Sequence, residues 1–210
     1  MTLRWLTALI FIGISSIING QTALNDTIFF MNGDILQCNI IDDSQIEVVF
    51  EFQKRKKSKK RKQLGVHKSE IFGIINDGVK ELYYEENEIV GDDLTVSEVE
   101  VYLAGQRDAR ELYKTKKIFY TGLGVTLAIS IAGEAGLLAV TVPLLIYPTA
   151  QYIPYIKIKG ETIVNPNHKF NLIYAEGYEG VARGKRVMAA LKGSAAGTVI
   201  GAFFYRLVLQ

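Results

Sequence analysis

Apolar residues in this chain gather in three segments and alternate with polar residues in a fourth. The three apolar segments are the extreme N-terminus, residues 118–156 and residues 187–209. Between Asp26 and Ile89, short apolar runs alternate with polar residues and are separated by turn residues. This distribution predicts an α+β membrane protein, with a leader, a small β domain and transmembrane helices.

The segment 26–89 predicts a small antiparallel β roll or barrel. Residues 46–53 alternate between apolar and more polar positions, the period-two pattern of a strand with one buried face. Asn32-Gly33 and the triplet 76–78, Asn-Asp-Gly, mark tight hairpin turns that need residues with positive φ. Five or six short strands joined by such turns fit a domain of SH3-like size.

The N-terminus predicts a secretion signal over residues 1–20. Arg4 supplies a positive charge, and an apolar run extends from Trp5 to Ile18. The length of this run suits a signal sequence and is short of the ~20 residues that cross a bilayer. Cleavage after Gly20 would place the β domain in the periplasm, and an uncleaved N-terminal anchor is the alternative.

The first membrane segment, 118–156, has an awkward length. Its 39 residues would make a helix of roughly 58 Å, against a bilayer core of about 30 Å, and they are too few for two full spans with a turn. Three prolines in its second half should interrupt a helix. We therefore expect one span over about 118–142, with a helical hairpin turning at 133–136 as the alternative.

A linker, a polar loop and a second transmembrane helix complete the predicted organisation. Residues 90–117 predict a linker and a juxtamembrane helix, whose start is marked by the capping-box pattern of Ser97 and Glu100. Residues 157–186 predict a polar loop, and 187–209 the second transmembrane helix. Two spans behind a cleaved leader would place this loop in the cytoplasm and the juxtamembrane helix in the periplasm.

A glycine ladder marks the last apolar segment. Gly193, Gly197 and Gly201 recur every fourth residue, which places them on one face of a helix. In membrane helices such a face lets two backbones approach closely. The first span is the predicted partner, and a second copy of the same helix, giving a homo-oligomer, is the alternative. The first span offers three glycines in return: Gly122, Gly133 and Gly136.

The strongest polar signal is a basic run at the predicted tip of a hairpin in the β domain. The run holds eight of the chain's 24 basic residues: Lys54, Arg55, Lys56, Lys57, Lys59, Lys60, Arg61 and Lys62. Behind a leader, such a run is expected either to bind anionic lipid headgroups or to form a solvated tip. No aromatic residue interrupts it, which disfavours base stacking, and no nucleic-acid partner is predicted.

Glu134 is the one acidic residue within the apolar segments. A carboxylate in hydrocarbon is costly and often marks a pore, a proton step or a partner. A small oligomeric channel or transporter subunit with Glu134 in its pore is therefore an alternative function. The single cysteine, Cys38, excludes an intramolecular disulfide and a cysteine-based metal cluster. No nucleophile–base pair stands out, so we predict no enzymatic activity, no cofactor and no metal.

Four short motifs are shared with a known group of proteins. In chain order they read DTIFFMNGDIL, KSEIFGI, GQRDARELY and EGYEGVARGKR, and glycines follow in the last apolar segment. By these motifs the chain resembles a family of uncharacterised envelope membrane proteins common in Bacteroidota. The resemblance implies a Gram-negative envelope location and no particular reaction. Glu134 and the basic run depart from the pattern of that family.

Together these features predict a non-enzymatic structural or interaction protein of the bacterial cell envelope. The β domain is expected in the periplasm, tethered to the inner membrane by helices that pack through glycines. The expected partners are membrane lipid, an unknown envelope protein and a second copy of the chain.

Overall fold

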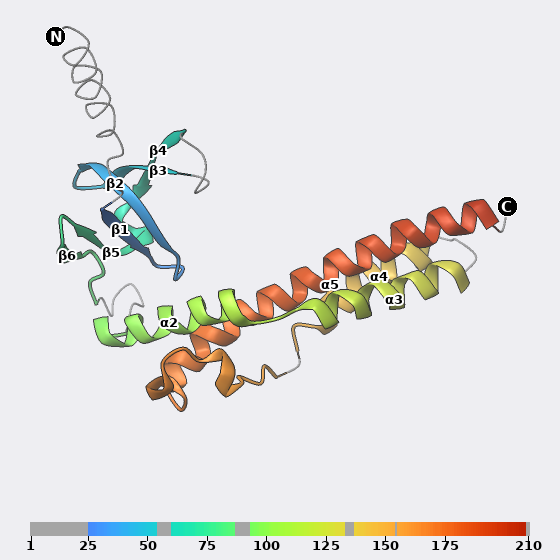
Figure 1. The fold of residues 1–210 in the computed structure, drawn as a ribbon. Helices are drawn as coiled ribbons and strands as arrows, with labels where there is room; N and C mark the ends of the chain where they lie inside the picture. The colour runs from blue at the N-terminus through green and yellow to red at the C-terminus, as the bar shows by residue number, and fades with distance from the viewer. Residues whose placement is uncertain (1–24, 54–59, 87–92, 133–136, 154, 209–210) are drawn as a thin grey trace, which may run out of the picture. The chain divides into compact units, whose positions relative to one another are not determined.

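The protein has an α+β fold that divides into two compact units. The computed structural model describes residues 25–53, 60–86, 93–132, 137–153 and 155–208. One unit holds the β-sheet and ends at Tyr84, and the other is mainly helical and covers Met31–Asp34 and Glu85–Gln210 (Figure 1). The α+β class predicted from the sequence is confirmed.

The β unit is a six-stranded antiparallel sheet in the order β4-β3-β2-β1-β5-β6. Every strand expected from the alternating pattern is present. The strands are β1 (Asp26–Phe30), β2 (Ile35–Asp43), β3 (Glu47–Gln53), β4 (Arg61–His67), β5 (Ile71–Asn76) and β6 (Val79–Leu82), with a 3-10 turn, η1 (Lys68–Glu70), before β5. The sheet is open, because β4 and β6 are edge strands that do not pair with each other among the described residues. Of the predicted roll or barrel, the small antiparallel sheet is therefore confirmed, and its closure into a barrel is not observed.

The two predicted hairpin turns differ in their backbone. At the second turn, Asp77 (φ 49°) and Gly78 (φ 82°) both have positive φ, as expected of a tight hairpin. At the first turn only Gly33 does, with φ 86°. There the side-chain oxygen of Asn32 accepts a hydrogen bond from the N–H of Asp34 at 2.8 Å. This side-chain turn takes the place of a second residue with positive φ.

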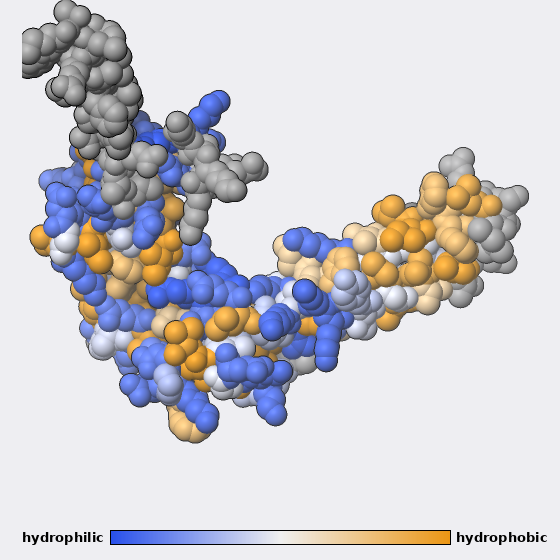
Figure 2. All heavy atoms as spheres, in the orientation of Figure 1, coloured by the Kyte–Doolittle hydropathy of each residue, from blue (hydrophilic) through white to orange (hydrophobic). Residues whose placement is uncertain are grey.

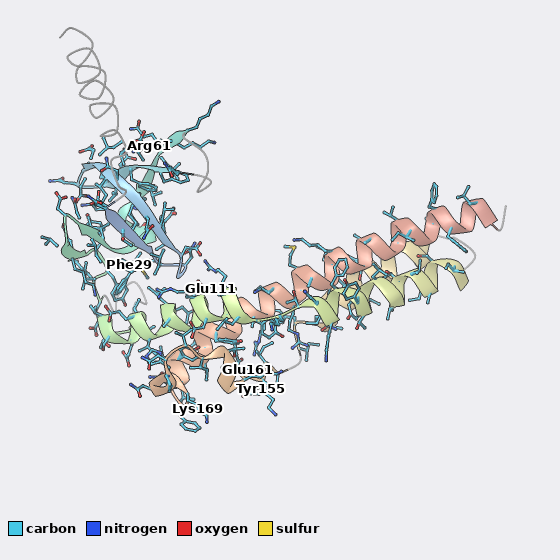
Figure 3. The ribbon with its side chains drawn as sticks, viewed as in Figure 1. Phe29, Arg61, Glu111, Tyr155, Glu161 and Lys169 are labelled. Atoms are coloured by element: carbon cyan, nitrogen blue, oxygen red, sulfur yellow. The ribbon has the colours of Figure 1, made fainter. Side chains whose placement is uncertain are left out.

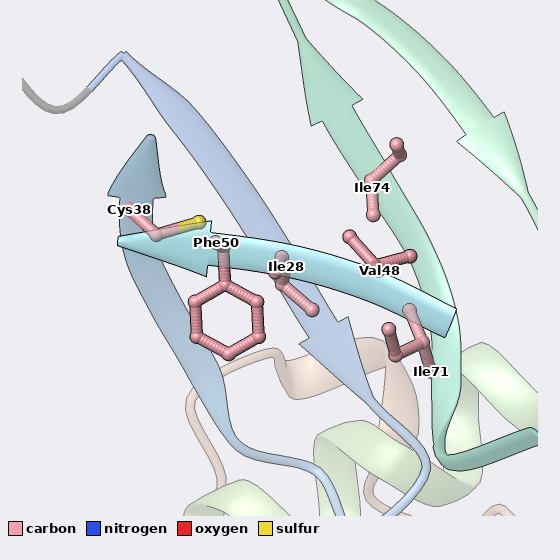
Figure 4. Close-up of a cluster of buried hydrophobic side chains, with 6 residues drawn as sticks. All are labelled: Ile28, Cys38, Val48, Phe50, Ile71 and Ile74. Carbon is pink, nitrogen blue, oxygen red and sulfur yellow. The ribbon is translucent and has the colours of Figure 1, made fainter. Parts of the chain in front are cut away.

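The core of the β unit shows that the sheet curls over its own face. Ile28, Cys38, Val48, Phe50, Ile71 and Ile74 form one cluster and are at most 1% exposed (Figure 4). Strands β3 and β5 are not hydrogen-bonded neighbours, yet residues of both strands share this cluster. Curling thus gives a small open sheet a buried interior. Burial, together with the charge of Asp26, raises the pKa of the Cys38 thiol to about 12.

A polar latch of three residues joins the end of β2 to the segment that follows β6. The carboxylate of Asp43 accepts a hydrogen bond from Tyr83 Oη at 2.6 Å and pairs with Lys68 Nζ at 2.7 Å. Lys68 Nζ also lies 4.2 Å from the centre of the Tyr83 ring. Burial raises the pKa of Asp43, but the hydrogen bonds from Lys68 and Tyr83 and the charge of Lys68 outweigh it, so the pKa lies below its usual value.

The helical unit contains four helices in the described part of the chain. They are α2 (Val96–Leu112), α3 (Lys116–Ala132), α4 (Leu137–Ala150) and α5 (Leu172–Val208), with 3-10 turns η2 (Gly160–Thr162) and η3 (Pro166–His168) before α5 (Figure 1). Helix α5 has 37 residues and is therefore about 55 Å long. It begins well before the predicted second transmembrane helix, so the second half of the predicted polar loop 157–186 is helical.

Helix α2 begins two residues earlier than its predicted cap. Thr95 is the N-cap, and its side chain accepts from the N–H of Glu98 while the Glu98 carboxylate accepts from the N–H of Thr95. The same Ser/Thr-x-x-Glu pattern occurs twice in succession in this sequence, and the upstream copy forms the capping box.

The apolar segment 118–156 does not form the single span predicted over 118–142. It contains most of α3 and all of α4, and residues 133–136 between them lie outside the described residues. Helix α4 packs against α5 and α3. Near its end, Tyr147 Oη donates to the carbonyl oxygen of Ile118 at 3.3 Å, so α4 ends beside the start of α3. The segment thus folds back on itself, as in the helical-hairpin alternative.

Candidate functional site in the helical unit

A stripe of glycines lies where α5 contacts α2 and α3. A methyl group added to Gly193 would lie 2.2 Å from the carbonyl oxygen of Phe119, and one added to Gly197 would lie 2.4 Å from that of Leu123. These distances are shorter than any real contact, so only glycine permits this approach of the two backbones. We call the four residues the glycine stripe: Gly177, Gly193, Gly197 and Gly201.

The stripe holds α2 and α3 in one register along α5. Gly177 lies against the carbonyl of Tyr102, and Gly201 lies near that of Leu127. The sequence separation between the residue on α5 and its partner is nearly the same in the two contacts. The partner on α2 or α3 moves forward along the chain as the residue on α5 does, so the helices run parallel. The break between α2 and α3 at 113–115 hardly shifts this register. Helix α5 therefore acts as one continuous partner for two consecutive helices.

Small hydroxyl residues fill the space beside the glycines in the α3–α5 half of the interface. Thr126 is fully buried, and its Oγ1 donates to the carbonyl oxygen of Gly122 on its own helix at 2.8 Å. Buried Ser130 lies on the same helix, with Ser194 and Thr198 opposite on α5. Small residues of this kind line close helix contacts in membranes.

The motifs GQRDARELY and EGYEGVARGKR meet in the α2–α5 half of the interface. Asp108, from the first motif, is 6% exposed. Its carboxylate accepts hydrogen bonds from Tyr174 Oη at 2.6 Å and from the N–H of Val164 at 2.9 Å. Tyr178, from the second motif, is buried and donates to Thr162 Oγ1 at 3.0 Å. The motifs thus bind α2, the start of α5 and the segment before α5 into one body.

Lys185 holds the break between α2 and α3 against α5. Its Nζ donates to the carbonyl oxygens of Ala109, Arg110 and Tyr113, at 3.1, 2.8 and 2.8 Å. Carbonyls at the C-terminus of a helix have no donor within the helix. An ammonium group at a helix C-terminus also interacts favourably with the helix dipole. Lys185 therefore caps α2 from the side of α5.

These contacts overturn the predicted arrangement of the juxtamembrane helix and the polar loop. That prediction placed the two on opposite sides of a membrane. In the structure, Val164 and Tyr174 from the loop hydrogen-bond to Asp108 of α2. Segments joined in this way could not lie on opposite sides of a membrane. The order of apolar segments along the chain could not show a contact between residues so far apart in the sequence.

The helical unit divides into a polar half and an apolar half. Hydrophilic residues predominate over the part that holds α2, with some hydrophobic residues among them, and hydrophobic residues cover most of the part where α3 and α4 run beside the end of α5 (Figure 2). Exposed apolar side chains of the second part include Leu145, Ile146, Val199, Phe203 and Leu207. An exposed apolar surface of this extent marks a membrane or a protein interface.

Basic residues gather where the two halves meet. Between Leu112 and Ala132, and again from Gly180 to Gln210, the sequence holds no acidic residue. Arg186 donates to the side chain of Gln151, just after α4, at 3.2 Å, which brings the end of α4 to this level. We call the basic residues of this region the basic collar: Lys114, Lys116, Lys117, Lys157, Lys159, Arg183, Lys185, Arg186 and Lys192.

Length and composition single out α5 as a helix that could cross a membrane. Among the described residues it is the one helix that is long and apolar enough, over Leu172–Phe204. Helix α3 has 17 residues and α4 has 14, or about 25 and 21 Å. Both fall below the ~30 Å of a bilayer core, so neither is long enough by itself to cross it.

The remaining predicted site residues are only partly described. In the basic run, residues 54–59 lie outside the described residues. Arg61 and Lys62 belong to β4, and Arg61 pairs with Glu51 at 3.1 Å, so this part of the run is strand and not hairpin tip. Glu134 also lies outside the described residues, and a pore role for it stays a prediction.

Sequence reasoning missed Asp108, Lys185 and Gly177 as parts of this site. One signal was available: Ala189 and Ala182 continue the small-residue face of the ladder toward the start of α5, at spacings of four and seven residues. The polar composition around Gly177 hid that relation. Asp108 is buried with its carboxylate hydrogen-bonded, and Lys185 is partly buried against backbone carbonyls, so the partners of both become visible only in the fold.

No protein-family model, curated protein or solved structure matches this chain. The likeness to Bacteroidota envelope proteins therefore stays a prediction based on the four motifs.

Proposed function

We propose that this chain is a non-enzymatic, membrane-anchored structural or interaction protein of the bacterial cell envelope. The helical unit is the anchor, with its apolar half in the membrane and its polar half outside. The β unit is the module that meets a partner. The leader directs the β unit to the periplasm, and the inner membrane holds the anchor.

One observation carries this proposal: the division of the helical unit into halves at the basic collar. Exposed apolar side chains of α4 and α5, such as Ile146 and Phe203, lie on one side of the collar. On the other side, Asp108 and Thr162 bind buried tyrosines through polar contacts. Long lysine and arginine side chains near the ends of membrane helices reach the headgroup region of a bilayer, and the close glycine packing matches membrane helices.

The open sheet supports the interaction role of the β unit. Its edge strands β4 and β6 each leave one side of the backbone without a strand partner in the described sheet. Val79 and Leu82 on β6 are 69% and 39% exposed. A partner strand can extend a sheet at such an edge, where main-chain hydrogen bonds supply the affinity.

Membrane extraction tests the anchor. The full chain is expressed in a Gram-negative host, and membranes are washed with high salt and then with alkaline carbonate. An integral protein remains in the pellet through both washes and dissolves only in detergent. Release by either wash would refute the anchor, because a protein bound only through charges leaves the membrane in salt.

Cysteine labelling tests the topology. We expect Ser97→Cys and Asn167→Cys to be labelled from the same side, because their segments are joined through Asp108. A cysteine appended after Gln210 should be labelled from the other side. The native Cys38 is fully buried, so the unmodified chain is the background control. Labelling of Ser97→Cys and Asn167→Cys from opposite sides would refute this fold of the anchor.

A further inference from the structure

A cavity lies between the start of α3 and the middle of α5, inside the basic collar. Its volume is about 390 Å³. Lys116, Lys185 and Lys192 supply its charged lining, and Phe119, Tyr120 and Met188 supply most of its apolar lining. Charged and apolar groups therefore share one cavity at the level where the polar and apolar halves of the unit meet.

Two of the lysines are available to a ligand. Lys116 and Lys192 are exposed and have no ion-pair partner among the described residues. Lys185 Nζ is already bound to three carbonyl oxygens, so it contributes its charge but no further hydrogen bond. No acidic residue lines the cavity in the described part of the chain. Three positive charges without a carboxylate make the cavity selective for an anion.

The start of α3 adds to this preference. Lys116 is the first residue of the 17-residue helix α3, and Thr115 before it also lines the cavity. The free N–H groups at a helix N-terminus and the positive end of its dipole favour a phosphate group. The apolar side of the cavity can contact the hydrocarbon part of the same ligand.

We propose that this cavity binds the headgroup of an anionic phospholipid. The phosphate lies between Lys116 and Lys192, and the glycerol and first acyl carbons lie against Phe119, Tyr120 and Met188. This proposal rests on the membrane anchor proposed above. It concerns a different part of the chain from the basic run of the β unit, and it makes the collar a specific lipid site as well as a boundary.

A phospholipid fits the lining better than a soluble phosphate does. A soluble anion would leave the aromatic and methionine side chains exposed to water, whereas a lipid covers them. Basic pockets between membrane helices commonly bind anionic headgroups. The occupant we expect therefore carries a phosphodiester and a net negative charge, as phosphatidylglycerol does.

Thermal unfolding in the presence of lipid tests the proposal. The purified full chain in neutral detergent is titrated with phosphatidylglycerol, and in parallel with phosphatidylcholine and with glycerol phosphate. The double variant Lys116→Gln/Lys192→Gln is compared with wild type. The control is Lys80→Gln/Lys169→Gln, which removes two charges outside the cavity, and Lys169 lies near the first turn of α5 (Figure 3).

We expect phosphatidylglycerol to raise the unfolding temperature of wild type and of the control, and phosphatidylcholine to have a smaller effect. Two lysines near a phosphate give about 30-fold in apparent affinity, which the cavity variant should lose. Equal response of the cavity variant and the control would overturn the proposal. A full response to glycerol phosphate would also overturn it, in favour of a soluble ligand. Carbonate extraction judges the anchor separately, so a wild-type chain that stays in the membrane but shows no preference for phosphatidylglycerol refutes the lipid site alone.

Discussion

The glycine stripe makes a sharp prediction at Gly197. An added methyl group there would lie 2.0 Å from Thr126 Oγ1 and 2.4 Å from the carbonyl oxygen of Leu123. The threonine side chain can rotate away, but the carbonyl belongs to the backbone of α3. Gly197→Ala should therefore force α3 and α5 apart by roughly 1 Å, since non-bonded heavy atoms settle at about 3.5 Å.

The same helix offers a matched control. Gly184 also lies in α5, and a methyl group added there meets no atom within 4 Å. Each substitution gains about 1 kcal/mol in helix propensity, so that gain cancels in the comparison. The overpacking at Gly197 costs about 1–3 kcal/mol. Gly197→Ala should thus be less stable than Gly184→Ala by that amount, or about 5- to 150-fold in the unfolding equilibrium.

Thermal unfolding in detergent, followed by circular dichroism, measures this difference. For a chain of this size it corresponds to a gap of roughly 2–12 °C between the two variants. Retention in the membrane fraction should be the same for both, because alanine is at least as apolar as glycine. If Gly197→Ala melts at or above the temperature of Gly184→Ala, the close contact between α3 and α5 is not present in the protein.

Three further predictions concern single side chains. A methyl group added to Gly201 would lie 2.4 Å from Cβ and 3.1 Å from Oγ of Ser130. Gly201→Ala should therefore lower the melting temperature, and a second change, Ser130→Gly, should restore it. A double variant as unstable as the single one would contradict this contact. The lowered pKa of Asp43 means that its stabilising effect is present above its ordinary pKa and is lost as the pH falls through the lowered value. Asp43→Asn should therefore cost roughly 1 kcal/mol at neutral pH and progressively less as the pH falls below the ordinary pKa of a carboxyl group, measured by urea unfolding followed by circular dichroism, and a cost that is independent of pH would refute the latch. Lys185→Met leaves three carbonyl oxygens without their donor and should destabilise the helical unit by about 1–3 kcal/mol, so an unchanged melting temperature would show that the cap is dispensable.

Local patterns were enough to predict the β unit. Alternation over 46–53 located β3, and the Asp77-Gly78 turn located the hairpin of β5 and β6, because period and turn chemistry act over a few residues. Closure of the sheet is a different matter. It depends on whether the two edge strands meet, and nothing local to β4 or β6 decides that.

The extent of α5 could not be read from hydrophobicity. Its first half buries Tyr174, Tyr178 and Ala182 against α2, while charged residues occupy the rest of its surface. Tyrosine and small residues give a weak apolar period, so the segment resembled a loop. Its helix is stabilised by contacts with residues far away in the sequence, such as the bond between Tyr174 and Asp108.

The spacing of the glycines predicted a close helix contact, and the structure places that contact between α5 and α3 of the same chain. The sequence could not give the direction of the partner helix. The parallel register follows from the return of α4, which brings the chain back before α5 begins. One span over 118–142 would have made the two helices antiparallel.

The contacts of α2 and α3 with α5 cannot form until α5 has been synthesised. Each contact along the glycine stripe joins an early helix to α5, and α5 is made last. At about 5–20 residues per second, the small-residue faces of α2 and α3 wait several seconds for their partner. During that interval the glycines and hydroxyl groups of α3 have no α5 to cover them. If the helical unit is the proposed anchor, these groups would face lipid until α5 arrives, and a chain that lacks α5 would leave them uncovered.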